Sequence, residues 1–211
     1  MKYIFLDFNG TVLDDTDICL ELLNDLLRMQ GKKEVSLKHY LDIFGFPVKD
    51  YYERAGLDFN IISFEKMAEY FIDEYTRRNV VECSIYPDFR DFVKEVKERG
   101  FKLVLCSASK QDLLIDQLKS FDILDCFDYV IGLSDYHAKS KLEVAKQFVK
   151  DNNINPKDIY FIGDTDHDHL LAQEIGGVSI LVTRGHQSLK VLEKCQAILV
   201  GSLMESLDYL K

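Results

Sequence analysis

Residues 3–11 read Tyr-Ile-Phe-Leu-Asp-Phe-Asn-Gly-Thr, an apolar run that ends in an acidic residue and a glycine turn. A short run of this kind, bounded by turn residues, is typical of a strand buried on both faces. In an open α/β sheet, ligands bind at the carboxyl ends of the strands, so Asp7 lies where a reactive carboxylate is expected. The stretch therefore predicts both a strand of a parallel sheet and one residue of its site.

Five further apolar runs follow along the chain, and amphipathic segments with helical spacing lie next to them. The apolar runs are residues 101–106, 129–133, 159–162, 178–182 and 197–200. The helical segments are residues 89–99, 111–121, 141–152, 168–175 and 189–194. Alternating strands and helices predict an α/β fold with a doubly wound, Rossmann-like parallel sheet.

One long stretch interrupts this alternation directly after the first strand. Residues 17–29 and 64–77 carry apolar side chains at helical spacing, and no convincing strand lies between them. The pattern predicts a helical insertion of residues 14–83 into a core domain of residues 1–13 and 84–211. The alternative is that these helices only pack onto the sheet as additional layers.

The composition of the chain excludes several classes of protein. Its 211 residues are 47% hydrophobic and 29% charged, the balance of a soluble globular protein. A net charge of −10 without a long basic run argues against nucleic acid as a partner. The scattered cysteines contain no CxxC pair, and no apolar stretch is long enough to span a membrane. We therefore expect a cytoplasmic protein with no membrane partner, as a monomer or weak homodimer.

Polar residues stand at three predicted strand ends and suggest one reaction class. Asp7 is a carboxylate that can act as a nucleophile, and Asp164 with Asp168 can hold a hard cation such as Mg²⁺. Ser107 and the backbone N–H groups that follow it can bind phosphate oxygens. With a lysine opposite, this combination predicts a phosphoryl-transfer site. Taken alone, the Gly-Asp-x-x-x-Asp pattern is more often a solvated turn and helix cap, and a serine at a strand end is more often a cap.

The order of these elements resembles the haloacid dehalogenase (HAD) superfamily, whose hallmark is Asp-x-Asp-Gly-Thr, then Ser or Thr, then Lys, then Gly-Asp-x-x-x-Asp. The insertion resembles the helical cap of the phosphoglycolate phosphatase and β-phosphoglucomutase branch. Residues 44–47, Phe-Gly-Phe-Pro, are similar to the cap substrate loop of that branch, and residues 102–110 are similar to its second motif. The resemblance implies a HAD-like core with a helical cap domain, a Mg²⁺ cofactor and a small phosphorylated metabolite as the partner.

The resemblance also implies a role for each matching residue. Asp7 corresponds to the nucleophile, which forms an aspartyl-phosphate. The implied metal ligands are Asp7, the carbonyl group of Asn9, Asp164 and Asp168. The implied substrate ligands are Thr11, Ser107, Ala108 and Phe46.

The active-site lysine has two candidates. Lys139 lies in the register of the phosphoglycolate phosphatase pattern, although the usual Lys-Pro is Lys-Ser here. Lys141 fits the shorter register of other branches. We assign the catalytic lysine to Lys139 and expect Lys141 to contribute to substrate binding. Asp166 and His167 have no corresponding family role, so we interpret them as exposed turn residues.

Asn9 is the most informative departure from the family pattern. In the family, an aspartate at this position protonates the leaving group and then helps to deprotonate the attacking water. An asparagine keeps the backbone carbonyl but cannot exchange a proton at neutral pH. The loss of a general acid–base group costs about 10²–10⁴ in rate, or about 3–5 kcal/mol.

Four interpretations of Asn9 follow. The first is a phosphatase with atypical acid–base chemistry, for substrates with activated leaving groups or with a base borrowed from His39, Glu53 or Glu65. The second is a phosphonate hydrolase, which needs a Schiff-base lysine. The candidates for that lysine are Lys32, Lys33, Lys49 and Lys66. The third is a mutase, which needs the missing acid most. The fourth is a catalytically impaired protein that binds a phosphorylated ligand or partner.

Overall fold

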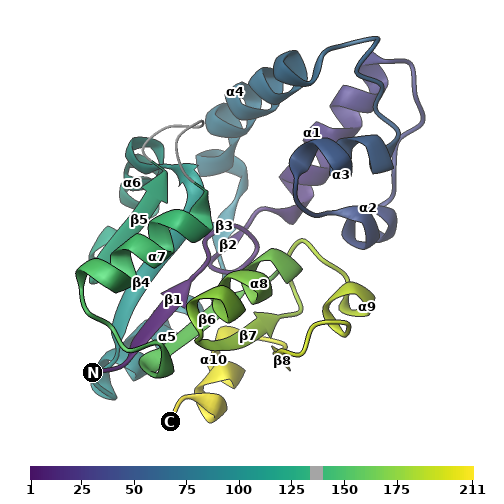
Figure 1. The fold of residues 1–211 in the computed structure, drawn as a ribbon. Helices are drawn as coiled ribbons and strands as arrows, with labels where there is room; N and C mark the ends of the chain where they lie inside the picture. The colour runs from purple at the N-terminus through teal and green to yellow at the C-terminus, as the bar shows by residue number, and fades with distance from the viewer. Residues whose placement is uncertain (134–139) are drawn as a thin grey trace.

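A six-stranded parallel sheet forms the centre of the computed structural model, which describes residues 1–133 and 140–211 (Figure 1). The strand order is β5-β4-β1-β6-β7-β8, so β1 lies in the middle. The strands are β1 (Tyr3–Leu6), β4 (Lys102–Lys110), β5 (Tyr129–Leu133), β6 (Ile159–Gly163), β7 (Val178–Val182) and β8 (Ile198–Val200). This topology confirms the predicted α/β fold with a doubly wound sheet.

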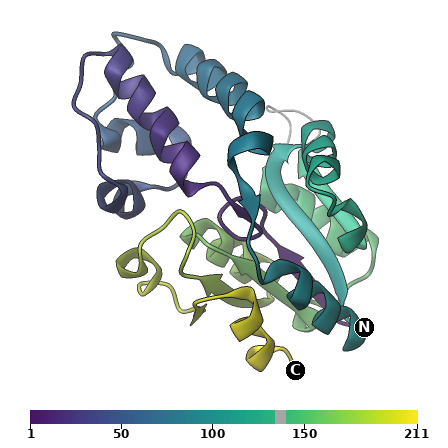
Figure 2. The same ribbon diagram turned by 180° about the vertical axis from the view of Figure 1, so that it is seen from behind.

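Helices cover both faces of the sheet, which explains why its strands read as continuous apolar runs. Successive strand residues point to opposite faces. Ile4 and Leu6 therefore pack in a cluster with helices α5 and α6, while Phe5 packs in a second cluster with α7 and α8. Figures 1 and 2 show α7 and α5 on opposite faces. The core helices are α5 (Phe89–Glu98), α6 (Gln111–Ser120), α7 (Lys141–Asp151), α8 (Asp166–Ile175), α9 (Leu189–Leu192) and α10 (Leu203–Ser206).

Four helices occupy the predicted insertion, and they lie beyond the carboxyl ends of β1 and β6 (Figure 1). They are α1 (Thr16–Met29), α2 (Leu37–Ile43), α3 (Val48–Ala55) and α4 (Phe64–Glu82). Their apolar side chains form a third cluster that includes Leu22, Leu23 and Tyr40. Residues 16–82 are all described and contain no strand. These helices therefore have a hydrophobic core of their own, as expected of a separate domain.

Two short strands join the insertion to the sheet, and the sequence pattern did not predict them. β2 (Leu13–Asp14) pairs with β3 (Ser84–Ile85) in antiparallel orientation, so the chain enters and leaves the insertion side by side. The division into domains at 14–83 places its boundaries at this ribbon and remains a prediction.

Two predicted boundaries are wrong for local reasons. β4 continues past residue 106, because its pairing with β5 resumes at Lys110 after an irregularity. Helix α4 continues past residue 77, because Arg78 forms ion pairs with Glu82 and with Glu21 of α1. Among the described residues, no helix has both the length and the apolar character needed to cross a bilayer.

Replacing Leu23 by alanine tests the domain division. Leu23 is fully buried in the cluster of α1–α4, so Leu23→Ala should lower the free energy of unfolding by about 2–5 kcal/mol. If the insertion is a separate domain, amide hydrogen exchange should accelerate within residues 16–82 and stay unchanged in β1 and β6. The exposed Leu170→Ala serves as the control and should have little effect. Equal acceleration in the sheet would contradict the division.

Candidate active site

The buried carboxylate of Asp7 lies at the carboxyl end of β1, beside the end of β6. The Asp7 backbone N–H donates a hydrogen bond of 2.9 Å to the carbonyl of Ile162, which holds the two strand ends together. Asp164 follows β6 directly, and Asp168 lies in the first turn of α8. Carboxylate oxygens of these three aspartates all lie within 4.8 Å of one another. The sheet therefore brings together the three carboxylates that the sequence singled out.

Lys141 lies at the first position of α7 and points between two of these carboxylates. Its ammonium group donates to Asp168 Oδ1 at 2.7 Å and to Asp7 Oδ1, and its side chain is only 4% exposed. A capping box formed by Ser140 and Glu143 fixes the start of the helix. Lys141 therefore occupies the position next to Asp7. Lys139, to which we assigned the catalytic role from the sequence, lies outside the described residues.

The loop that follows β6 orients Asp168. Its Oδ2 atom accepts hydrogen bonds from the Thr165 hydroxyl at 2.7 Å and from the Thr165 backbone N–H at 3.1 Å. The Asp168 side chain also crosses over Gly163, where a Cβ atom would lie 2.3 Å from its carboxylate carbon. The Gly-Asp-x-x-x-Asp pattern therefore needs its glycine for space and its second aspartate as both a helix cap and a partner of Lys141.

Asp164 is held by two segments that come from elsewhere in the chain. Its Oδ2 accepts a 2.7 Å hydrogen bond from the backbone N–H of His186, and its Oδ1 accepts one of 3.2 Å from the Thr11 hydroxyl. Gly10 packs against the same carboxylate with a φ of +71°, where a side chain would clash. The sequence assigned Thr11 to substrate binding, but it is fully buried and does not line the cavity. The Thr11 hydroxyl is thus directed toward Asp164, and its assignment to substrate binding stays a prediction.

Burial and mutual repulsion control the charges of the carboxylates. Burial raises the pKa of Asp7 to about 8. The neighbouring carboxylates of Asp168 and Asp164 raise this pKa further, and Lys141 offsets only part of the increase. Burial likewise raises the pKa of Asp164 to about 6. Asp168 behaves differently, since Lys141 and the Thr165 hydrogen bond hold its pKa below the ordinary value despite burial. Lys141 thus offsets the charges of Asp7 and Asp168, while His186 is the opposing charge for Asp164, and the three carboxylates form a donor set that fits a hard divalent cation.

Ser107 and Ala108, which we assigned to substrate binding from the sequence, line the cavity on the other side of Asp7. The Ser107 hydroxyl accepts a hydrogen bond of 3.1 Å from the backbone N–H of Ser109. Helix α6 begins at Gln111, so its N-terminus faces the same region. Hydroxyl and backbone N–H groups at this end of β4 can bind phosphate oxygens.

The side chain of Asn9 is already engaged by the protein. Its amide donates to Asp15 Oδ2 at 2.7 Å and contacts the Tyr75 hydroxyl at 2.6 Å. Tyr75 in turn donates to the same oxygen of Asp15 at 2.7 Å. The amide therefore connects the strand β1 segment to α4 of the insertion.

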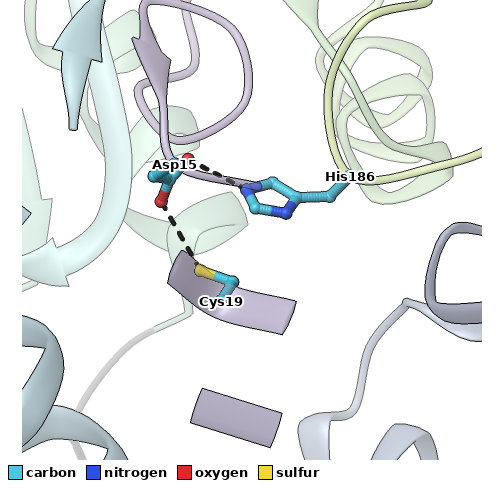
Figure 3. Close-up of side chains that lie close together, drawn as sticks. All are labelled: Asp15, Cys19 and His186. Carbon is cyan, nitrogen blue, oxygen red and sulfur yellow. Dashed lines mark hydrogen bonds and ion pairs between the residues drawn. The ribbon is translucent and has the colours of Figure 1, made fainter. Parts of the chain in front are cut away.

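Asp15 is a buried acceptor for several groups, as Figure 3 shows for two of them. Its Oδ1 receives the Gly10 backbone N–H at 2.9 Å and lies 3.1 Å from His186 Nε2, while Cys19 Sγ lies 3.7 Å from Oδ2. Burial lowers the pKa of His186, but Asp15 outweighs it and raises that pKa to about 9. His186 correspondingly holds the pKa of Asp15 below its ordinary value despite burial. The two side chains therefore form a buried ion pair next to Asn9.

The sequence analysis missed this ion pair. His186 follows β7, whose carboxyl end lies at the same edge of the sheet, so the strand-end argument could have pointed to it. Asp15 follows the glycine turn by five residues but carries no spacing signal of its own. His186 also contacts the Tyr40 hydroxyl at 2.7 Å, and Ser188 N–H donates to the carbonyl of Leu41. This loop therefore joins the core to α2.

A cavity of about 610 Å³ opens from Asp7 toward the space between α4 and α6. Phe46 of residues 44–47, which we assigned to substrate binding from the sequence, lines it and packs against the His167 ring at a centroid distance of 4.8 Å. Asp166 accepts a 2.8 Å hydrogen bond from Gln187. Both Asp166 and His167 are half-buried, so their interpretation as exposed turn residues is wrong. The reason is that the cap loop and the loop after β7 both pack onto the start of α8.

Comparison with known proteins places this geometry in a family. The haloacid dehalogenase-like hydrolases match residues 3–182, and the chain belongs to this family. A phosphoglycolate phosphatase of Nitrosospira multiformis is 24% identical over 98% of this chain and 94% of the relative. One of Vibrio vulnificus is 26% identical over 88% of this chain and 85% of the relative. The comparisons therefore confirm the expected hydrolase, whose relatives are phosphatases.

Solved structures agree with the fold. A haloacid dehalogenase-like hydrolase of Streptococcus pneumoniae superimposes with a TM-score of 0.85 at 22% identity, covering 100% of this chain and 99% of its own. A structure from Clostridium acetobutylicum, described as a predicted phosphatase, has a TM-score of 0.83 at 23% identity, covering 99% of this chain and 97% of its own. Both likenesses extend through the helical insertion, so the whole chain has the architecture of this family.

The buried ion pairs of Lys141 should dominate the stability of the site. Lys141→Met leaves Asp7 and Asp168 buried without their counter-charge, and the expected loss in unfolding free energy is about 3–5 kcal/mol. Denaturant unfolding in the presence of a chelator measures this loss without a contribution from metal. Lys146 lies on the same helix as Lys141 and forms an exposed pair with Glu174 of α8, so Lys146→Met should change stability little. Similar small effects from both variants would contradict the arrangement.

Proposed function

We propose that the protein is a Mg²⁺-dependent phosphatase that hydrolyses a small phosphorylated molecule through an aspartyl-phosphate on Asp7. The observation that carries this proposal is the Asp7 carboxylate, which lines the cavity and is paired with Lys141 beside Asp164 and Asp168. The names of the phosphoglycolate phosphatases similar to this chain support the reaction type.

In the proposed reaction, a carboxylate oxygen of Asp7 attacks phosphorus and the ester oxygen leaves. Lys141 and the Ser107 hydroxyl hold the phosphate oxygens, and Lys141 also keeps Asp7 oriented. Water then attacks the phosphorus of the aspartyl-phosphate and releases Asp7 and inorganic phosphate. Asp7, Asp164 and the carbonyl of Asn9, with Asp168 nearby, would hold Mg²⁺. When bound, the cation would offset the negative charge of the phosphate.

The first interpretation of Asn9 was a phosphatase with atypical acid–base chemistry. Of its two versions, the one in which the substrate has an activated leaving group has the best support. His39, Glu53 and Glu65, which could lend a base, do not line the cavity. The amide of Asn9 is held by Asp15 and Tyr75 and cannot supply a proton. A leaving group that departs as a stable anion does not need to be protonated, so the reaction then needs no proton donor.

Of the other interpretations of Asn9, the phosphonate hydrolase is disfavoured and the phosphate-binding protein is retained. A phosphonate hydrolase needs a Schiff-base lysine, but the four lysines considered for it, all in described parts of the chain, do not line the cavity. A phosphate-binding protein without turnover is the second candidate, and it is favoured because the Asn9 amide nitrogen donates to Asp15 and Tyr75.

Removal of one carboxylate tests the proposed metal site. Asp164→Ala should lower Mg²⁺ affinity at least about tenfold, because it deletes a buried oxygen ligand. Isothermal titration calorimetry with MgCl₂ measures this affinity. Asp116→Ala removes an exposed carboxylate at the cavity rim and is the matched control. Unchanged affinity in the Asp164 variant would count against the site.

Restoring the acid tests the function of Asn9. The native protein should hydrolyse acetyl phosphate and p-nitrophenyl phosphate far faster than alkyl phosphates. Asn9→Asp should raise alkyl phosphate hydrolysis by up to about 10²–10⁴ and change activated substrates less. Because the new carboxylate would face Asp15, the double variant with Asp15→Asn should be measured beside it. Steady-state release of inorganic phosphate is the readout.

Asp7→Asn is the control and should abolish both activities. If neither the native protein nor the Asn9 variants hydrolyse any phosphate ester, the phosphatase proposal fails. The phosphate-binding alternative then takes its place and can be checked by calorimetry with inorganic phosphate.

A further inference from the structure

The cavity differs sharply between its two ends. At the Asp7 end it contains the carboxylates, Lys141 and Ser107. On the side of the insertion, apolar and aromatic side chains prevail. That side is lined by Tyr40, Phe44, Phe46, Val48, Tyr51, Tyr52, Phe64, Ala68, Phe71, Ile72, Tyr75 and Val80 with the polar Asp15, Cys19, Thr76 and Asn79. A phosphate group fits the first end, and an apolar group fits the second.

The insertion supplies no cation to this cavity. Residues 14–83 are all described, and none of the lysines or arginines among them lines it. Lys49 lies over the Phe59 ring instead, and Arg54 donates to the carbonyl of Ile43. A carboxylate on the substrate, as in phosphoglycolate, would therefore find no cation on this side of the cavity, since Lys110, Lys141 and His186, which also line it, belong to the core.

The shape of the apolar end suits a planar ring. Phe71 and Tyr75 stack on one another along α4 with an interplanar angle of 8°. Opposite them, Leu113 and Gln117 of α6 line the cavity. Leu113 and Ile72 are 40% and 37% exposed, so apolar area is available to a ligand there. At about 610 Å³, the cavity has room for a bicyclic ring as well as a phosphate.

Asn9 provides an independent argument about the leaving group. A phenolic hydroxyl has a pKa of about 10, whereas an alkyl alcohol, like water, is far less acidic. An aryl oxide can therefore leave without a proton donor, and an alkoxide cannot. The apolar end of the cavity and the missing acid at Asn9 therefore both favour a substrate with an aromatic leaving group.

From these two observations we infer that the substrate is an aryl phosphate monoester, with the phosphate at Asp7 and an uncharged aromatic ring system between α4 and α6. This inference rests on the proposed phosphatase function. The Asp7 oxygen–phosphorus bond forms as the phosphorus–aryl oxygen bond breaks, and the electron pair stays on the aryl oxide. Water then forms a bond to phosphorus as Asp7 is released. The attacking water releases one proton to solvent and the phosphate keeps the other, while the aryl oxide takes up one proton from solvent.

A set of four substrates tests the inference. 1-Naphthyl phosphate and 1-naphthylmethyl phosphate carry the same ring, but only the first has a phenolic leaving group. Acetyl phosphate has an activated leaving group without a ring, and phosphoglycolate carries a carboxylate. We expect kcat/KM for 1-naphthyl phosphate to exceed that for 1-naphthylmethyl phosphate by about 10²–10⁴ and those for the other two by at least about tenfold.

A charged side chain in the apolar end provides the second arm. Ile72→Arg should raise KM for 1-naphthyl phosphate at least about tenfold, because it places a cation where the ring binds. Ile61→Arg is the matched control, since Ile61 is exposed in the insertion but does not line the cavity. Thermal unfolding checks that both variants are folded. An unchanged KM in a folded Ile72→Arg variant would overturn the placement of the ring.

The outcomes separate this inference from the function on which it rests. Preferred hydrolysis of acetyl phosphate or phosphoglycolate overturns the aryl phosphate inference and leaves the phosphatase proposal standing. Equal rates for the two naphthyl substrates also overturn it, because the leaving group then has no effect. Absence of hydrolysis with all four substrates contradicts the phosphatase proposal and the inference together.

Discussion

The ammonium group of Lys141, buried between Asp7 and Asp168, links the three segments that form the site. Asp7 belongs to the end of β1, Asp168 to α8 and Lys141 to α7, so the ion pairs hold both helices against the centre of the sheet. Burying a charge is costly unless it is paired. Here the Lys141 ammonium group and the carboxylates of Asp7 and Asp168 offset part of this cost for one another. The remaining excess of negative charge is what makes the same group of side chains suitable for a cation.

Asn9 shows how one departure from a family pattern is accommodated by its surroundings. Its amide donates to Asp15, which is paired with His186 and receives the Tyr75 hydroxyl. An aspartate at this position would face another carboxylate at hydrogen-bonding distance. The asparagine therefore matches its neighbours electrostatically, and it ties α4 to the strand that carries Asp7.

The insertion has a double role in the architecture. Its own apolar cluster makes it cohesive, while the loop after β7 attaches α2 to the core through His186 and Ser188. The short ribbon of β2 and β3 is the covalent connection. The apolar wall that α4 presents to the cavity is consequently positioned by contacts on both sides, and it gives the site an environment that differs strongly from the charged end at Asp7.

The parallel sheet, the helical insertion and the placement of Asp7, Ser107, Asp164 and Asp168 at or just after strand ends were predictable from the sequence, because hydrophobic periodicity and strand polarity are local properties. The tertiary structure decided what depends on contacts between distant segments. It brought Lys141 to Asp7, turned Thr11 toward Asp164, and joined Asn9 to Asp15 and Tyr75. It also decided which cap side chains face the cavity, since a helical pattern alone does not tell whether an aromatic ring faces the core of the insertion or a ligand.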